Sequence, residues 1–405
     1  MVDFDDLPMY QREIEKASSN HMKSVMGIDA GTQSIKVLIY DFESKKLLAD
    51  ASAPLELSSK SDGSNEQQAH WWTEVLTQAL AEIEPSIRKT VAAVGVSGQQ
   101  HGFVPLAADG SVLAPVKLWC DTSTSLECSE IMATFGGEEK CVAELGNPIL
   151  PGYTASKILW LKKNKAEAYN RLATIMLPHD YLNFWLTGQR VMEYGDASGT
   201  GLLDIRRRRW HTGMLAAVDA DRDLSGCLPD LIDAGELIGK LLPDIAAKLG
   251  LPADAVVSTG GGDNMMAALG TGNIRPGELT VSLGTSGTVF GYSDVPVIDG
   301  ENELAAFCSS SGGWLPLLCT MNCTVATNLT RELFGLSHDE AEQMATSAPI
   351  GSAGLLTLPF FNGERTPNLP DARAVLQGIT TQNFTQANVL RSAMEAATYS
   401  LRRGL

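Results

Sequence analysis

Residues 26–34 read MGIDAGTQS, where an apolar segment runs into a turn that carries Asp29, Gly31, Thr32 and Gln33. The backbone amides of such a turn can form a concavity that binds anions such as phosphate. Asp29 would repel phosphate unless a cation lay between them, and Mg²⁺ prefers carboxylate, water and phosphate oxygens. The turn therefore indicates a metal–nucleotide site. The alternative is a hairpin turn that uses Asp and Gly for its geometry alone.

A second acid follows three glycines in the stretch GGGDN, where Asp263 and Asn264 stand at the predicted start of a helix. A carboxylate there can accept the proton of a hydroxyl that attacks phosphorus, while Asn264 holds the substrate. The glycines allow the substrate to approach the backbone closely. The simpler alternative, which spacing alone favours, is that Asp263 only caps the helix.

The stretch SGQQHG, residues 97–102, follows a predicted strand. Ligands of α/β proteins gather at the carboxyl ends of strands, so Gln100 and His101 are candidates to hydrogen-bond sugar hydroxyls. A lone histidine is otherwise more often structural. The stretch IRRRRW, residues 205–210, is predicted to be a solvated loop because the chain around it is acidic.

Three strands are predicted at residues 25–28, 35–40 and 47–53, and their short connections make them antiparallel. Apolar residues at helical spacing predict a helix over residues 70–83. Residues 91–98 form a continuous apolar run, which is typical of a strand in a sheet covered on both faces. This order indicates a mixed α/β domain.

The strand–turn–strand design occurs a second time. Residues 278–294, ELTVSLGTSGTVFGYSD, repeat the pattern of the first hairpin around a Gly-Thr turn. The repeat indicates two similar lobes, each of which presents a hairpin turn to one cleft. The boundary between the lobes is predicted near residues 273–276.

Composition narrows the function further. The chain has 405 residues, enough for two or three domains, and its net charge of −17 argues against a nucleic-acid or anionic-membrane surface. No apolar run reaches the roughly 18 residues of a membrane span. Seven irregularly spaced cysteines favour reduced thiols in a cytoplasmic protein. Residues 1–24 lack a signal-peptide pattern and are predicted to be an appended or disordered segment, the alternative being a native helix.

Taken together, these stretches resemble the FGGY family of carbohydrate kinases and, within it, the xylulokinases. The motifs occur in family order from about residue 25 to the end, and SGQQHG is the most xylulokinase-like of them. The motifs are GIDAGTQSIKV, GVSGQQHG, LWCDTST, LPGYTASKILWL, LPHDYLNFWLTG, DASGTGLLDI, STGGGDN, SLGTSGTVF and FNGERTP.

The resemblance implies the two-lobe, actin-like ATPase fold (ribonuclease H-like) with mixed sheets. It implies ATP-dependent phosphorylation of a small ketose, D-xylulose, with Mg²⁺, and it leaves a homodimer open. Asp263 corresponds to the general base, and Asp29 to the residue that orders Mg²⁺. The other roles carried over are sugar contacts at Gln100, His101, Asp263 and Asn264, and nucleotide contacts at Thr32, Gln33, Gly284, Thr285, Ser286 and Gly287.

The same resemblance implies an N-terminal lobe over residues 25–273 and a C-terminal lobe over residues 274–405. The second lobe is predicted to be incomplete, because YSLRRGL stands inside a helix that the family continues and no adenosine-binding Gly-rich motif follows residue 288. From this we expect the 405-residue chain to bind sugar without useful ATP binding. Cys120 stands where many bacterial members have Asn.

Three rival functions remain. Another pentulose kinase of the family, acting on ribulose or a related ketose, would share the motifs. A non-catalytic sugar-binding pseudokinase would bind sugar without turnover. An actin-like or chaperone-type ATPase is disfavoured, because GERTP and SGQQHG have no place in the patterns of those proteins.

Overall fold

The computed structural model describes residues 24–361, 363–367, 369 and 371–403. These residues form two compact units, one of residues 24–274 and 307–314, the other of residues 275–306 and 315–403. The predicted appended segment, residues 1–24, lies outside the described residues except for Ser24, which begins the first strand.

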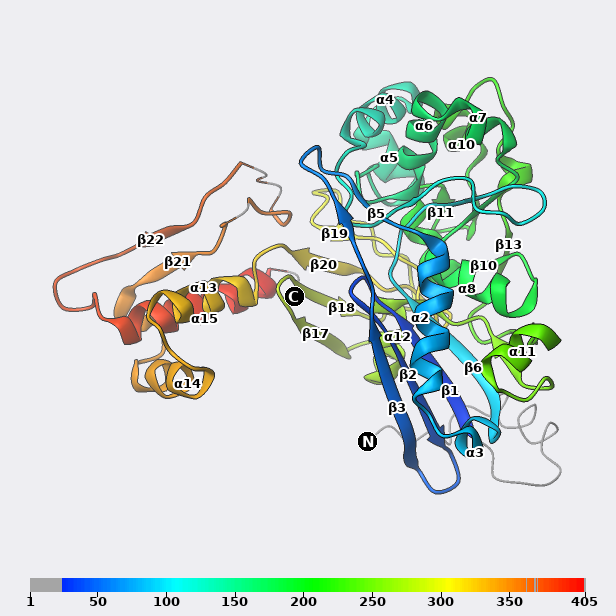
Figure 1. Ribbon diagram of the computed structural model, residues 1–405. Helices are drawn as coiled ribbons and strands as arrows, with labels where there is room; N and C mark the ends of the chain where they lie inside the picture. The colour runs from blue at the N-terminus through cyan, green and yellow to red at the C-terminus, as the bar shows by residue number, and fades with distance from the viewer. Residues whose placement is uncertain (1–23, 362, 368, 370, 404–405) are drawn as a thin grey trace. The chain divides into compact units, whose positions relative to one another are not determined.

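The first unit is built on a seven-stranded mixed sheet (Figure 1). The strand order is β14-β15-β6-β1-β2-β3, and the short β16 also pairs with β6. β1, β2 and β3 are successive antiparallel neighbours, whereas β6 is parallel to β1, β15 and β16. The strands are β1 (Ser24–Ala30), β2 (Ser34–Asp41), β3 (Lys46–Pro54), β6 (Val91–Gly98), β14 (Leu237–Lys240), β15 (Val256–Ser258) and β16 (Gly261–Gly262).

One face of this sheet carries the main core. Alternate residues of β1, including Met26 and Ile28, are buried, as a pleated strand with one covered face requires. Three helices pack there, α2 (Ala69–Ala81), α8 (Pro178–Thr187) and α11 (Pro243–Leu249), with Trp72 of α2 edge-on to Tyr181 of α8. The prediction that β6 is covered on both faces is wrong, because its second face carries small, half-buried residues.

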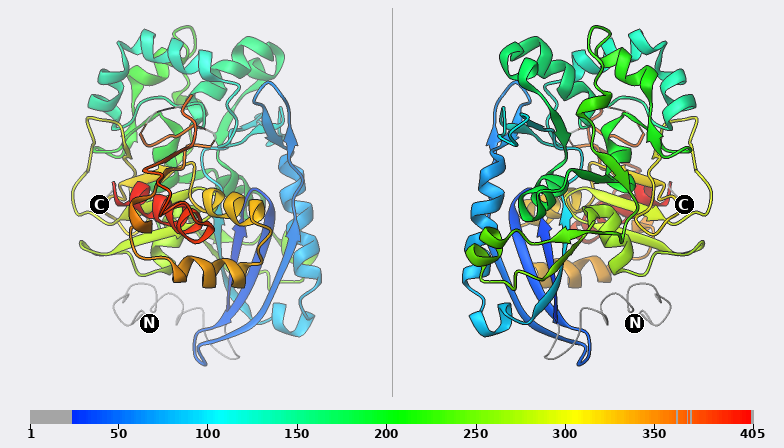
Figure 2. Two further views of the ribbon diagram at one scale, coloured as in Figure 1. Left: turned by 90° about the vertical axis from the view of Figure 1, so that its left-hand side faces the viewer. Right: turned by 90° about the vertical axis from the view of Figure 1, so that its right-hand side faces the viewer.

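A separate helical core occupies another part of the first unit. Its helices, α4 to α7 and α10, lie together at one end of that unit in Figures 1 and 2, and they bury Ile131, Ile158 and Met214. The helices are α4 (Ser125–Phe135), α5 (Glu138–Leu145), α6 (Thr154–Asn164), α7 (Ala166–Arg171) and α10 (Thr212–Val218).

Short elements connect these layers. The helical ones are α3 (Pro85–Arg88), α9 (Tyr194–Ala197), the 3₁₀ turns η2 (Ser198–Thr200) and η3 (Ser225–Cys227), and α12 (Asp263–Gly270). The small strands form the sets β4-β5-β8, β7-β9, β10-β13 and β11-β12. Their bounds are β4 (Ser58–Ser59), β5 (Asn65–Gln67), β7 (Val104–Leu106), β8 (Val116–Lys117), β9 (Thr174–Met176), β10 (Val191–Glu193), β11 (Leu203–Asp204), β12 (Arg209–Trp210) and β13 (Asp230–Ile232).

Residues 307–314, which we call the strap, belong to the first unit although their sequence neighbours on both sides belong to the second. The Cys308 amide donates to Ser198 Oγ at 3.0 Å. The Arg208 guanidinium donates to the Gly312 and Gly313 carbonyls and lies over the Trp314 ring. The predicted solvated loop at 205–210 is therefore wrong for Arg208, which anchors the strap.

The second unit contains the other predicted hairpin. β17 (Leu279–Leu283) and β18 (Gly287–Gly291) are antiparallel and belong to a four-stranded sheet of order β17-β18-β20-β19, with β19 (Leu304–Ala305) and β20 (Leu317–Thr320). Within this unit, α13 (Thr324–Leu333) and α14 (His338–Ser347) pack on the long helix α15 (Gln386–Arg402), shown in orange and red in Figure 2. The remaining elements are η4 (Ser352–Gly354), β21 (Leu356–Leu358) and β22 (Val375–Gln377).

The structure confirms the predicted local elements. The three N-terminal strands, the helix near residues 70–83, the strand at 91–98 and both hairpins are present. All seven cysteines are free, as expected of reduced thiols. Among the described residues, no helix is long and apolar enough to cross a membrane. The shared cleft between the two hairpins stays a prediction.

Candidate active site

The ends of the neighbouring strands β1, β6 and β16 bring the candidate residues of the first unit to one edge of the sheet. Ser97 of β6 pairs with Asp29 of β1 on one side and with Gly261 of β16 on the other. Two strand spacings of about 4.8 Å each therefore separate the backbones that carry Asp29 and the start of α12. The pairing therefore brings Asp29 and the start of α12 to the same end of the sheet.

Asp263 is the first residue of α12, and the N-cap is Gly262. The prediction that Asp263 is only an N-cap is therefore wrong. Its Oδ1 accepts hydrogen bonds from the Asn264 amide at 2.8 Å and from Asn264 Nδ2 at 3.1 Å. Burial, with a smaller contribution from the charges of Asp196 and Asp29, raises the pKa of Asp263 to about 7.

The predicted sugar residues Gln100 and Asn264 meet directly. Asn264 Nδ2 donates to Gln100 Oε1 at 2.9 Å, and Gln100 Nε2 donates to the sulfur of Met265 at 3.3 Å. Gly262 permits this approach, since a Cβ at that position would lie 2.7 Å from Gln100 Cγ. The hydrogen bond between Gln100 and Asn264 thus connects the end of β6 to the start of α12. From the sequence, only the family resemblance placed these two side chains in one site.

His101 follows in the same loop and has a left-handed backbone, with φ of +64°. Its ring is half-buried and lies near two aromatic rings, those of Tyr153 and Phe307. The imidazole is therefore held by neighbours from two distant parts of the sequence.

Asp29 remains accessible at the end of β1, with 46% of its side chain exposed. Its Oδ1 accepts from Ser97 Oγ at 3.4 Å, and its Oδ2 lies 3.8 Å from Lys36 Nζ. A half-exposed carboxylate beside a hydroxyl offers the oxygen donors that a hydrated Mg²⁺ takes. The residues present therefore fit such an ion.

The first turn is fixed by its neighbours. Thr32 Oγ1 donates to Gln99 Oε1 at 3.1 Å and accepts from Trp119 Nε1 at 2.9 Å, while the Gln33 carbonyl accepts from the Leu55 amide at 2.8 Å. The Gln33 side chain is exposed. These contacts hold the backbone of the turn in one shape.

The second predicted turn, residues 284–287, connects β17 to β18. Its carbonyls point at the start of α13, because the Thr285 carbonyl accepts from the Cys323 amide at 2.9 Å and the Gly284 carbonyl from the Thr324 amide at 3.0 Å. Ser286 is half-buried and Gly287 is buried. The four residues form one turn within the second unit.

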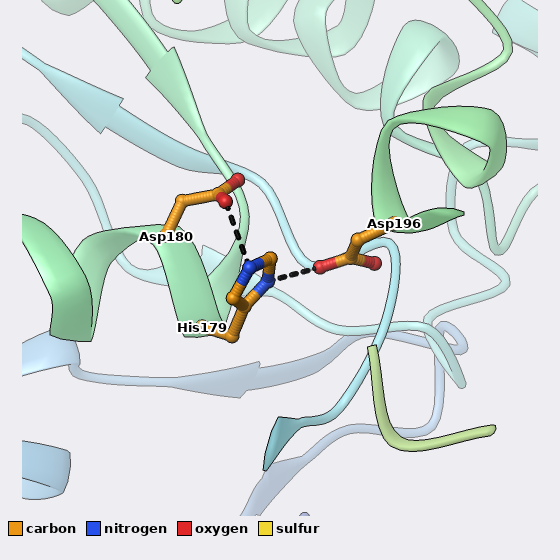
Figure 3. A group of neighbouring side chains, drawn as sticks. All are labelled: His179, Asp180 and Asp196. Atoms are coloured by element: carbon orange, nitrogen blue, oxygen red, sulfur yellow. Dashed lines mark hydrogen bonds and ion pairs between the residues drawn. The ribbon is translucent and has the colours of Figure 1, made fainter. Parts of the chain in front are cut away.

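A buried polar network lies behind the first site, and Figure 3 shows three of its members. His179 Nδ1 and Asp196 Oδ2 are 2.6 Å apart, and His179 Nε2 lies 3.1 Å from Asp180 Oδ1. Glu193 Oε2 accepts from the Asp196 amide at 3.1 Å. A Cβ at Gly98 would lie 2.8 Å from His179 Cβ, so the network packs on the end of β6.

Electrostatic interactions and burial shift the pKa values of His179, Asp180 and Glu193. Two carboxylates beside the ring outweigh the burial that opposes charge and raise the pKa of His179 to about 9, while burial raises the pKa of Asp180 to about 8 and that of Glu193 to about 7. The three labelled groups could hold a metal ion by spacing. They fit a hydrated Mg²⁺ poorly, because all are fully buried and already bonded to one another.

Sequence reasoning assigned no role to this network or to Lys157. His179, Asp180, Asp196 and Lys157 lie in motifs that carry only the family resemblance, whereas Glu193 lies just before one of them. The motifs are LPHDYLNFWLTG, DASGTGLLDI and LPGYTASKILWL. A usable signal was available: His, Asp and Lys stand inside apolar stretches, and charged groups are rarely buried unless they are paired.

Comparison with known proteins identifies the family. The model described as "FGGY family of carbohydrate kinases, N-terminal domain" matches residues 24–270, more than half of the chain. This chain belongs to the FGGY family of carbohydrate kinases. Sugar kinases of this family transfer phosphate from ATP to an alcohol group, so the chain is a carbohydrate kinase.

Named FGGY relatives are similar over most of the chain. A xylulose kinase from Haemophilus influenzae is 43% identical over 387 residues, which are 94% of this chain and 78% of that protein. A xylulose kinase from Streptomyces coelicolor is 36% identical over 379 residues, 93% of this chain and 75% of that protein.

A solved structure gives the same fold. The "xyloylose kinase" from Brucella ovis matches with a TM-score of 0.87 at 29% identity, over 94% of this chain and 78% of that one. The predicted actin-like ATPase fold of an FGGY kinase is thereby confirmed.

Proposed function

We propose that this FGGY kinase transfers the terminal phosphoryl group of ATP to the terminal hydroxyl of D-xylulose, which gives D-xylulose 5-phosphate. The choice of sugar is supported by similarity to proteins named xylulose kinase. The observation that carries the chemistry is the Asp263 carboxylate, which is bonded to Asn264 and, through it, to Gln100 at the end of β6.

Asp263 acts as the general base. The sugar hydroxyl oxygen forms a bond to the γ-phosphorus, its proton passes to the Asp263 carboxylate, and the bond from phosphorus to the β–γ bridging oxygen breaks to release ADP. A pKa of about 7 suits this role, because a base works best when its pKa lies near the working pH.

The sugar is held by amides and a ring. Gln100 and Asn264 offer amide groups on one side of Asp263, and His101 offers an imidazole from the same loop as Gln100. Neutral hydrogen-bonding groups suit the uncharged hydroxyls of a ketose, whereas a phosphorylated substrate would favour cationic side chains.

The phosphate end uses other residues. Thr32 and Gln33 of the first turn, and Gly284, Thr285, Ser286 and Gly287 of the second, provide backbone amides and hydroxyls for the nucleotide phosphates. Asp29 would hold hydrated Mg²⁺, which neutralises phosphate charge when it is bound. The Ser97 hydroxyl donates a hydrogen bond to Asp29 Oδ1 at 3.4 Å, which helps to hold this carboxylate in place.

A ketose panel tests the proposal. ADP release is measured with D-xylulose, D-ribulose and other pentuloses in the presence of Mg-ATP, and calorimetry measures binding of each sugar without nucleotide. The highest kcat/KM is expected with D-xylulose. A preference for D-ribulose would assign the chain to another pentulose kinase. Sugar binding without turnover would support the pseudokinase only if calorimetry shows that the chain also binds Mg-ATP.

A further inference from the structure

His101 is the one predicted sugar contact with a strained backbone. A non-glycine residue at φ of +64° is uncommon and persists only where its surroundings impose it. The loop after β6 thus contains a strained backbone conformation whose energetic cost must be offset elsewhere in the first unit.

Lys157 and Thr154 of α6 hold that conformation. Lys157 Nζ donates to the His101 carbonyl at 2.8 Å and to the Gly152 carbonyl at 2.8 Å, and Thr154 Oγ1 donates to the same His101 carbonyl at 3.1 Å. Lys157 and Thr154 have no exposed surface. Burial lowers the pKa of Lys157 to about 7, so this ammonium is kept in the core at a cost.

The ring of His101 is confined as closely as its backbone. The Tyr153 and Phe307 rings lie 5.0 and 5.9 Å from it between centroids, and the Phe307 ring is nearly parallel to it. On another side stands Gly199 of η2, where a Cβ would lie 1.8 Å from His101 Nδ1 and 2.0 Å from Cε1. The imidazole therefore fills the space that a side chain at position 199 would take.

We propose that Lys157 and Gly199 are positioning residues for the sugar, Lys157 by fixing the His101 backbone and Gly199 by leaving room for its ring. The sugar-binding part rests on the proposed function, in which His101 contacts the ketose. Neither residue touches the sugar in this scheme, and both act through one imidazole.

The chain contains a matched control for Gly199. Gly226 is the middle residue of η3, Ser225–Cys227, as Gly199 is of η2, Ser198–Thr200, and neither glycine has positive φ. A Cβ at Gly226 would meet nothing within 4 Å. Gly226→Ala therefore adds the same methyl group to the same kind of turn without touching His101.

The first arm measures the D-xylulose Kd by calorimetry without nucleotide. Gly199→Ala should weaken binding about tenfold or more, because the added methyl displaces the ring. Gly226→Ala should change the Kd less than about twofold. Lys157→Met keeps the apolar stem but loses the donors, and it should weaken binding about tenfold. Thermal unfolding checks that each variant is folded. If Lys157→Met does not fold, the result for Gly199→Ala decides the test.

The second arm repeats both substitutions in a His101→Ala background. If they act through the imidazole, each should then change the Kd less than about twofold. The same fold loss with and without His101 would show a general structural role and overturn the proposal.

The third arm observes the imidazole itself in sugar-free protein. His101 is one of six histidines, and its NMR signal is assigned by its loss in His101→Ala. Gly199→Ala and Lys157→Met should shift this signal, whereas Gly226→Ala should not. An unshifted signal in both variants would overturn the positioning claim. An unchanged D-xylulose Kd in His101→Ala would remove His101 from the proposed sugar site and overturn the sugar-binding part of the proposal. The NMR result would still decide whether Lys157 and Gly199 position the imidazole.

Discussion

The two hairpins around Gly-Thr turns share a design but differ in their surroundings. β1–β2 lies inside a seven-stranded sheet, where β1 has a parallel partner, β6, on its other side. β17–β18 lies at the end of its four-stranded sheet, with β17 on the edge. Among the described strands, the first hairpin therefore has a pairing partner on its outer side, β6, whereas β17 of the second hairpin has none there.

Those neighbours bring charge to the first hairpin. Asp29 stands two residues before its turn glycine, Gly31, and the pairing of β6 with both β1 and β16 brings the start of α12 into the same region. In the second hairpin the residue two positions before Gly284 is Ser282, which is exposed. The second turn is instead bonded to the start of α13.

The difference indicates a division of labour. Under the proposed function, Asp29 and Asp263 of the first unit would serve metal binding and proton transfer, whereas the second turn would contact phosphate through small residues and hydroxyls. The same backbone motif would then serve two roles, and its position in the sheet would decide which side chains lie beside it.

The largest effect should come from the acid beside the first hairpin. In a form of the enzyme that binds Mg-ATP, Asp263→Asn keeps the shape and the hydrogen bonds of the side chain but cannot accept a proton, so kcat should fall by roughly 10²–10⁴. Steady-state turnover with D-xylulose measures it, with sugar binding by calorimetry as the control. Near-normal turnover would show that Asp263 is not the general base and that the first unit does not differ from the second in this role.

The same variant should change stability with pH in a defined direction. The pKa of Asp263 is raised in the folded state, so deprotonation destabilises the fold as pH rises from the unfolded value, near 4, toward 7. Asp263→Asn removes this loss, and its Tm should exceed that of the wild type at pH 8 but not at pH 4. Equal Tm differences at both pH values would contradict a raised pKa.

Asp29→Ala and Ser282→Ala form a direct test of the comparison. Asp29→Ala should lower kcat by about 10², because the acid expected to order the metal is lost. Ser282→Ala, at the corresponding place in the second hairpin, should change kcat by less than about twofold. Both variants should keep their D-xylulose affinity; loss of that affinity in Asp29→Ala with unchanged Mg²⁺ dependence would remove the metal role.

Substitution of a turn glycine by alanine should be tolerated better in the first hairpin than in the second. A Cβ at Gly287 would lie 2.9 Å from Leu401 Cδ2 and 3.0 Å from Thr320 Oγ1, whereas one at Gly31 would make only an ordinary 3.4 Å contact. Gly287→Ala should therefore destabilise the protein by about 1–3 kcal/mol. Gly31→Ala should cost no more than about 0.5 kcal/mol in denaturant titrations. Equal costs would show that the second turn is not the more tightly packed.

The smallest expected effect is a shift in a pH profile. Asp196 adds to the raised pKa of Asp263, after burial, through its negative charge. Asp196→Asn should therefore move the acidic limb of kcat/KM toward lower pH, by less than about one unit. A limb that stays in place would show that the charge of Asp196 does not contribute to the Asp263 pKa.

Local patterns made much of this fold predictable. The period-2 alternation of β1 and β2 and the helical spacing of Trp72, Leu76 and Leu80 depend only on nearby residues, and the structure confirms them. The predictions were wrong where pairing between distant segments of the chain determines the local structure. Gly262, rather than Asp263, is the N-cap because β16 pairs with β6 up to that residue.

The candidate site was predictable in part for the same reason. Gln100 and Asn264 were found through motifs, but their 2.9 Å hydrogen bond joins residues far apart in the chain. Lys157 beneath His101 and Asp196 beside His179 depend on how α6 and α8 pack. No pattern within a short window contains such pairs.

The strap also has a consequence for how the chain folds during synthesis. Ribosomal synthesis proceeds from the N-terminus, so residues 24–274 are made before residues 307–314. Until the strap is made, Arg208 cannot reach the Gly312 and Gly313 carbonyls, and Phe307 cannot stack on His101. The first unit therefore becomes complete only after the β17–β18 hairpin of the second unit has been synthesised.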